Sequence, residues 1–250
     1  NKSNIDSEFN KIIKTTDSNE PFNLYTKSDN LDIFKNELSE ISFFPKSKTS
    51  WVGYDFNNSI ENLYLSGVTK ISDSINGKIS ILKNLEASQT KSDRIIPNSF
   101  STFLTFSIND PERFIFNFKD YLKFNDLSTQ NLNFNSLKIV DEISFVEDQE
   151  KFVILNLINK DQVENYFRLE KFDDNNNIKK IVLDEDINIL FKNIDNKIFG
   201  EYAVLLGDLL VITKSLSQIK KIINSQNIND NLGSNDKYLN FKEQKSNSYS

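Results

Sequence analysis

The stretch from Phe100 to Leu122 changes its hydrophobic period abruptly, and this change limits what the chain can fold into. In its first half, apolar and polar residues alternate, as they do in a half-buried strand. Beyond Asp110 and Pro111, apolar residues recur at helical spacing. Asp110 can accept hydrogen bonds from the free N–H groups of a helix, and Pro111 suits the first helical position. We therefore predict a strand, a cap and an amphipathic helix that covers a sheet.

The same succession of strand, polar cap and short helix is predicted twice more. One copy covers Phe152 to Leu169 with Asn159 as its cap, and the other covers Leu209 to Ile223 with Ser215 as its cap. Both caps have a side chain that can accept a hydrogen bond from the first helical turn. The residues of the three copies do not align well, so we interpret them as a structural echo rather than a sequence repeat.

Three hairpins are predicted, because apolar runs flank short segments of turn-forming residues. They pair residues 51–56 with 63–68, 137–145 with 152–158, and 202–206 with 209–212, the last around Gly207. Further strands are expected at 181–183 and 187–191, and further helices at 5–13, 29–38 and 79–85. Together these elements predict an α+β fold, with a largely antiparallel sheet, repeated strand–helix units and short amphipathic helices packed on one face.

The best internal boundary is the polar segment 87–97, which ends at Pro97. We therefore expect a partial N-terminal element at 1–45 and a hairpin with a short helix at 46–97. A second α+β unit, truncated at its C-terminus, is expected at 98–250.

The composition argues against several functions. The 250 residues include no His and no Cys, which removes the usual general base and metal ligand, thiolate chemistry and disulfides. The net charge is −6 without a basic run, so neither nucleic-acid binding nor docking on an anionic membrane is expected. No apolar run approaches the roughly 20 residues of a membrane span. Because Met is absent even at position 1, we interpret the chain as a mature or trimmed segment, and any signal peptide or lipid-carrying Cys would lie upstream of it.

Two groups of acids are candidates for acid–base chemistry: Asp141 with Glu142, and Glu185 with Asp184 and Asp186. Neighbouring residues on a strand point to opposite faces, so Asp141 and Glu142 are poorly placed to share a substrate. A solvated edge or turn explains them better. A carboxylate-based hydrolase would need two acids about 5–10 Å apart across one cleft.

Two oxygen-rich segments, Asp173–Asn177 and Asn229–Asp236, invite comparison with calcium loops. Neither has the alternating ligands, central Gly and distant Glu of an EF-hand, so flexible polar loops explain them better. Ser72-Asp73-Ser74 could be a nucleophile site, but no base is available for it and no Gly-x-Ser-x-Gly elbow exists. We therefore expect no catalytic residue, cofactor or metal.

Three aromatic residues, Trp51, Tyr54 and Tyr64, would form a sugar-stacking platform if they faced outward. Trp51 and Gly53 occupy alternate positions of one strand and are expected to face a core instead. The three residues remain the candidate ligand-binding set of an alternative function.

Several short motifs between residues 45 and 250 carry a family resemblance. They are Trp51–Asp55, Leu63-x-Leu65-x-Gly67, Ser72-Asp73-Ser74, Ile96-Pro97, Asp110, Glu142-Ile143, Phe199-Gly200, Leu232–Tyr238 and Ser246-Asn247. In this order they resemble an uncharacterised family of bacterial cell-envelope proteins common in the Bacteroidota. The resemblance implies repeated α+β units, often preceded by a lipoprotein-type signal and followed by a β-propeller-like region. It brings no established activity or catalytic residues.

From these features we expect a non-catalytic, exported envelope domain, periplasmic or associated with the outer membrane. It would act as a scaffold or interaction module for other envelope proteins. Such a domain should expose an apolar patch or an unpaired strand edge. The alternative is a small-ligand or glycan-binding domain.

Overall fold

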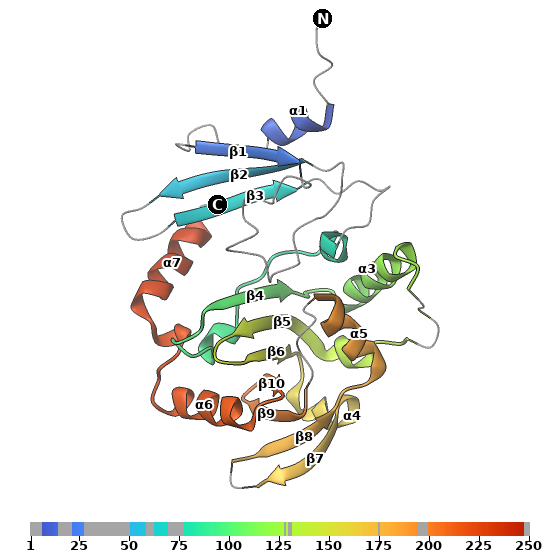
Figure 1. Cartoon of the computed structure of the whole chain (residues 1–250), viewed down its shortest axis with the longest axis vertical. Helices are drawn as coiled ribbons and strands as arrows, with labels where there is room; N and C mark the ends of the chain where they lie inside the picture. The colour runs from blue at the N-terminus through green and yellow to red at the C-terminus, as the bar shows by residue number, and fades with distance from the viewer. Residues whose placement is uncertain are drawn as a thin grey trace, which may run out of the picture. The chain divides into compact units, whose positions relative to one another are not determined.

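The computed structural model of the chain describes residues 7–14, 22–27, 51–58, 63–69, 78–127, 129, 132–174, 176–194 and 200–247 (Figure 1). The chain forms two compact units: Asn1–Lys83 with Asn117–Thr129, and Asn84–Phe116 with Gln130–Ser250. The segments 1–45, 46–97 and 98–250 stay a prediction, because compactness does not show which segment folds on its own. The helix expected at 29–38 lies outside the described residues.

A three-stranded antiparallel sheet dominates the first unit, in the order β1 (Phe22–Lys27), β2 (Trp51–Asn58) and β3 (Leu63–Thr69). The predicted β2–β3 hairpin is confirmed, since Asn58 pairs with Leu63. The predicted N-terminal helix is α1 (Ser7–Ile13), which packs against β2. The helix expected at 79–85 is a 3₁₀ turn, η2 (Lys78–Leu82).

A seven-stranded antiparallel sheet forms the body of the second unit, in the order β4-β5-β6-β10-β9-β8-β7. Its strands are β4 (Thr102–Ser107), β5 (Val140–Glu147), β6 (Lys151–Leu157), β7 (Arg168–Asp173), β8 (Ile178–Val182), β9 (Tyr202–Leu206) and β10 (Leu209–Thr213). The predicted β5–β6 and β9–β10 hairpins are confirmed, and Gly207 has the positive φ of 65° that the second turn requires. The α+β class is therefore confirmed.

Short helices and 3₁₀ turns follow these strands in the sequence. The α-helices are α3 (Pro111–Phe124), α4 (Val163–Tyr166), α5 (Glu185–Ile194), α6 (Leu216–Asn227) and α7 (Asp236–Asn247). The 3₁₀ turns are η3 (Ser92–Arg94), η4 (Asn135–Ile139), η5 (Lys160–Gln162) and η6 (Leu232–Ser234). Within the described part of the chain, none of the helices has the length and apolar content needed to cross a membrane.

The three predicted caps are confirmed. Asp110 accepts a hydrogen bond from the N–H of Arg113 at 2.9 Å at the start of α3. Asn159 accepts from the N–H of Asp161 at 3.1 Å in η5, and Ser215 accepts from the N–H of Gln218 at 3.2 Å in α6. Each strand therefore ends where a side chain satisfies the first free donors of the next helix.

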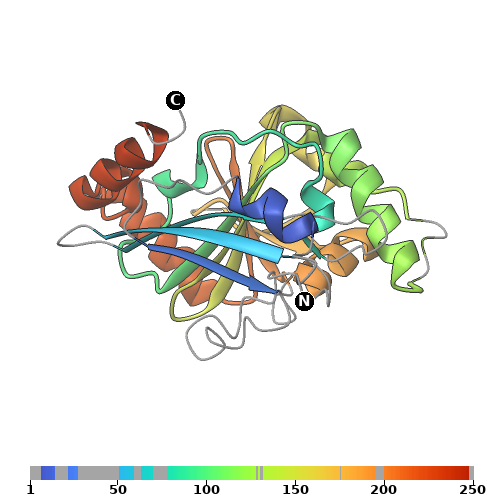
Figure 2. The same ribbon diagram turned by 90° about the horizontal axis from the view of Figure 1, so that it is seen from above.

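The expectation of helices on one face is corrected, because helices cover both faces of the large sheet. On β5, Phe145 contacts Phe191 of α5, with ring centroids 5.8 Å apart. The next residue, Val146, points to the opposite face, where it belongs to a buried cluster with Ile219 and Ile222 of α6. Figure 2 shows the same elements from above.

Three expected elements differ from the structure. Residues 187–191 lie in helix α5 and not in a strand, because the acids before them occupy its first turn. The helix expected after Asn159 ends at Tyr166, and Leu169 lies in β7. The strand expected from residue 137 begins at Val140, after the 3₁₀ turn η4.

Candidate functional site

Polar side chains gather beneath η3 on one face of β4, β5 and β6. At the centre is Glu142, only 2% exposed on a strand otherwise rich in apolar residues. Its two carboxylate oxygens accept hydrogen bonds from the backbone N–H groups of Lys91 at 2.8 Å and Ser92 at 2.9 Å. A residue of the sheet thereby satisfies two backbone donors 51 and 50 positions earlier in the chain, of which the N–H of Ser92 is buried and the N–H of Lys91 is part-buried.

Three hydroxyl groups extend this network across two strands. The Oγ atoms of Ser92 and Ser144 lie 2.6 Å apart, and Oγ of Ser144 lies 2.8 Å from Oγ1 of Thr105. A serine nucleophile needs a base within hydrogen-bond reach, and the nearest acid here, Glu142, lies 3.5 Å from Oγ of Ser144. Ser92 and Ser144 are fully buried, so their hydroxyls bond to protein groups and are closed to a substrate in this conformation.

Asp141 and Glu142 do not lie on a solvated edge as expected, and a β-bulge in β5 accompanies this difference. The register of β5 shifts between Val140 and Glu142, which re-aims the side chains there. Asp141 accepts hydrogen bonds from Nζ of Lys91 at 2.6 Å and from the side-chain amide of Asn156. Both acids therefore bond to Lys91, and Glu142 is buried instead of lying on a solvated edge. All four carboxylate oxygens hold structural hydrogen bonds, which leaves the hydrolase hypothesis without support from this pair.

Within the described residues, one buried polar atom of this network, on Asn156, has no hydrogen-bond partner. The residue is 3% exposed, and its Oδ1 is the buried side-chain polar atom for which the described part of the chain supplies no donor. Its amide group is oriented by the bond from Nδ2 to Asp141. No group of three or more acids within the described residues is placed to hold a metal ion.

A second carboxylate, Asp93, joins η3 to the last helix. Nζ of Lys242 donates to Oδ2 of Asp93 at 2.5 Å and to the backbone oxygen of Thr90 at 2.9 Å. Tyr238 on the same helix has a pKa above its ordinary value, first because it is buried and then because Asp93 and Glu142 oppose a phenolate. The polar network and its charges thus hold α7 against the sheet.

A third carboxylate, Asp148, organises the β5–β6 turn. It accepts hydrogen bonds from Nζ of Lys221 at 2.6 Å, Nε2 of Gln218 at 3.1 Å and Oγ of Ser99 at 3.2 Å. Burial acts to raise the pKa of Asp148. The hydrogen bond and the positive charge of Lys221, together with the hydrogen bonds from Gln218 and Ser99, lower the pKa below its ordinary value. This turn therefore anchors α6.

In the second group of acidic candidates, Asp184, Glu185 and Asp186, the buried member forms structural hydrogen bonds. Asp186, in the first turn of α5, is buried and accepts hydrogen bonds from the N–H groups of Phe134 at 2.6 Å and Ile187 at 2.9 Å. Asp184 and Glu185 are exposed beside it. These three acids therefore lie at the start of α5, and Asp186 is the buried one that forms hydrogen bonds with backbone N–H groups.

The two oxygen-rich segments form hydrogen-bonded turns. In the first, Asp173 accepts bonds from the backbone and side-chain N–H groups of Asn176 at the β7–β8 turn. In the second, expected to be flexible, the side chains of Asp230 and Asn235 both bond to Asn98. The backbone N–H of Leu232 also donates to the oxygen of Ile96 at 2.9 Å, so this segment is hydrogen-bonded to residues 96–98.

The aromatic candidates lie in the first unit. The ring of Trp51 is half-buried and packs against Phe9 of α1, with centroids 4.5 Å apart, and Gly53 is buried. Tyr54 lies on β2 and Tyr64 on β3, and their side chains fall outside what the structure describes. Ser72-Asp73-Ser74 also lies outside the described residues. A ligand-binding role for the three aromatic residues stays a prediction.

Sequence reasoning missed the burial of Ser92, Asp93 and Glu142. One signal was available: polar residues occupy same-face positions of three adjacent strands, with Thr105 on β4, Ser144 on β5 and Asn156 on β6. Such a stripe on strands with apolar neighbours indicates a buried polar layer, although it does not name the covering segment.

Searches against protein-family models, curated proteins and solved structures each found no match to this chain.

Proposed function

We propose that the chain is a non-catalytic, exported envelope domain that acts as a scaffold or protein-interaction module within a larger protein or complex. Its partner is another envelope protein, and a lipid anchor upstream would tether it. The family resemblance supports the compartment. The acids and hydroxyls described above support the absence of catalysis, because they bond to one another and to backbone groups.

The observation that carries the proposal is an exposed aromatic group beside an open sheet edge. Phe172 on β7 is 44% exposed, and its ring centroid lies 5.2 Å from that of Tyr202 on β9. Nζ of Lys180 lies 5.5 Å from the centre of the Phe172 ring, a cation–π distance. Val182, on the same face of β8 as Lys180, is 45% exposed. An exposed aromatic side chain that packs against a second aromatic ring can anchor a protein interface.

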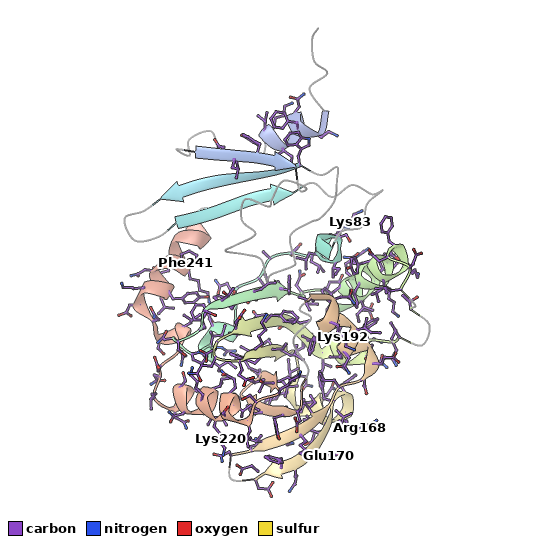
Figure 3. All side chains as sticks on the ribbon, viewed as in Figure 1. Lys83, Arg168, Glu170, Lys192, Lys220 and Phe241 are labelled. Atoms are coloured by element: carbon purple, nitrogen blue, oxygen red, sulfur yellow. The ribbon has the colours of Figure 1, made fainter. Side chains whose placement is uncertain are left out.

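Photo-cross-linking in cells of the organism that encodes the chain tests this proposal. A photoreactive amino acid replaces Phe172 in one variant and Lys220, exposed on α6 and labelled in Figure 3, in a control variant. We expect position 172 to give a discrete adduct with an envelope protein that position 220 does not give. Identical adduct patterns at the two positions, or a cytoplasmic partner at position 172, would contradict the proposal.

The second candidate function is small-ligand or glycan binding by Trp51, Tyr54 and Tyr64. It is favoured by the partial exposure of Trp51, whose ring is the kind of surface on which sugars stack. Glycans and peptidoglycan fragments are titrated at millimolar concentration into the wild type and a Trp51→Ala variant. Binding lost in the variant supports this function, and no binding to the wild type disposes of it.

A further inference from the structure

The outer strand of the large sheet has backbone groups directed away from its neighbour. Within the described residues β7 pairs with β8 alone, and Leu169 lies opposite Ile181. The N–H of Ile181 donates to the oxygen of Glu201 at 3.0 Å, on the β9 side of β8. In an antiparallel pair, residues opposite each other either both bond across the pair or both point away from it. The N–H and C=O of Leu169 therefore point to the open edge.

Two exposed charges of opposite sign flank Leu169. Arg168 and Glu170, both labelled in Figure 3, are two positions apart on β7, and side chains two positions apart on a strand lie on the same face. No ion pair joins either of them to the residues that the structure describes. Across β8, Glu170 lies opposite Lys180 and Arg168 lies opposite Val182.

These charges select one way for two copies of β7 to pair. A two-fold axis perpendicular to the sheet places one residue opposite its own copy. Centring on Glu170 or Lys171 opposes two like charges, which destabilises the pair. When the two-fold axis passes through the Leu169 pair, Arg168 lies opposite Glu170 of the second copy, and Glu170 lies opposite Arg168 of the second copy. The bulge of β7 lies beyond Lys171, so the strand is regular where this pairing occurs.

We propose that β7 is a self-association edge, at which a second copy of this chain pairs antiparallel about Leu169. The two Leu169 residues exchange backbone hydrogen bonds, and Arg168 and Glu170 form two ion pairs across the interface. These charged residues lie at the closely spaced positions, with Cα atoms about 4.5 Å apart. Charged residues on an edge strand usually prevent pairing with another chain. Here they permit pairing in the single register that is centred on Leu169. This inference deepens the proposed function by naming a second copy as one partner.

Charge-swap variants test the pairing by sedimentation equilibrium of the full chain. Arg168→Glu and Glu170→Arg each oppose like charges twice, and the double variant restores opposite charges. Leu169→Pro removes an N–H that points to the open edge, which an edge strand tolerates. Lys220→Glu on α6 is the matched control for a charge reversal at an exposed site. The melting temperature of every variant is measured, because Lys180 lies opposite position 170.

We expect the wild type to dimerise and each single charge reversal to raise the dimer dissociation constant tenfold or more. The double variant should return to within about threefold of the wild type, Leu169→Pro should be folded and monomeric, and Lys220→Glu should leave the dimer unchanged. A wild type that is monomeric at about 1 mM overturns the inference. So does a dimer that the single variants leave intact or that the double variant does not restore. Cross-linking of Phe172 to an envelope protein would stand in each of these cases, so the two proposals fail separately.

Discussion

Lys242 of α7 donates to the buried carboxylate of Asp93 at 2.5 Å, which joins two residues 149 positions apart. In contrast to α6, whose Ile219 and Ile222 are fully buried, α7 has no fully buried side chain among those whose burial is described. Its attachment to the sheet therefore depends strongly on this ion pair and on the packing of Tyr238 against Phe103, with ring centroids 6.2 Å apart.

Lys242→Met is expected to lower the free energy of unfolding by about 3 kcal/mol, because it leaves the buried carboxylate of Asp93 without its cation. Lys237→Met, at an exposed position of the same helix, should change it by less than about 0.5 kcal/mol. Urea denaturation followed by circular dichroism measures both values. Equal effects of the two substitutions would show that the ion pair does not hold the helix.

Glu142→Ala is expected to lower the free energy of unfolding by about 3 kcal/mol, since the buried N–H of Ser92 and the part-buried N–H of Lys91 lose their acceptor. Glu142→Gln keeps one acceptor oxygen and should lose less. Glu150→Ala removes an exposed acid from the nearby turn and serves as the control. If Glu142→Ala unfolds at the same urea concentration as the control, the carboxylate does not support η3 as described.

Asp148 should make stability fall in acid. Its pKa is lower in the folded protein than in the unfolded chain, where it is about 3.9. Between these two values the unfolded chain binds more protons, so the stabilisation is present above about pH 4 and is lost as the pH falls through the folded pKa. Asp148→Asn should therefore be destabilised relative to the wild type at pH 7, and the difference should shrink below pH 4.

Unfolding free energies of the wild type and Asp148→Asn at several pH values test this linkage. Lys221→Met should reduce the same pH dependence, because it removes the main hydrogen-bond donor and positive charge beside Asp148. A difference between the two proteins that stays constant from pH 7 to pH 3 would be inconsistent with the lowered pKa.

Gly200→Ala should destabilise the fold by about 1–3 kcal/mol through overpacking. A Cβ at this position would lie 2.3 Å from Cγ2 of Ile212, which is fully buried on β10, and 3.2 Å from Cδ1 of Leu183. At Gly207→Ala the cause is different, because no atom lies within 4 Å and only the positive φ opposes a side chain. Thermal unfolding measures both, and an unchanged melting temperature for Gly200→Ala would refute the close approach.

Local signals predicted much of the fold. The Ser215 cap, the Gly207 turn and the Asp110–Pro111 boundary each depend on residues near one another in the sequence, and each is found in the structure. The strand expected at 187–191 is wrong, because a short apolar run fits a strand as well as a buried helix. The acids at 184–186 were the better guide there.

The candidate site could not be predicted in the same way. The burial of Glu142 depends on two N–H groups fifty positions earlier, in a segment with no periodic pattern. The register of β5 shifts at Asp141, which interrupts the alternation of side chains between the two faces, and no local sequence rule places this shift. Such features follow from tertiary contacts and not from hydrophobic period.

The affinity of the cross-linked envelope protein for the wild type and for Phe172→Ser tests the proposed interaction function most directly. Because the substitution also removes the packing of Phe172 against Tyr202, worth about 0.5–1.5 kcal/mol, affinities are compared at a temperature at which thermal unfolding shows both proteins folded. If Phe172 is the anchor of the contact, the dissociation constant should rise tenfold or more. A dissociation constant that is the same for both proteins would contradict the account.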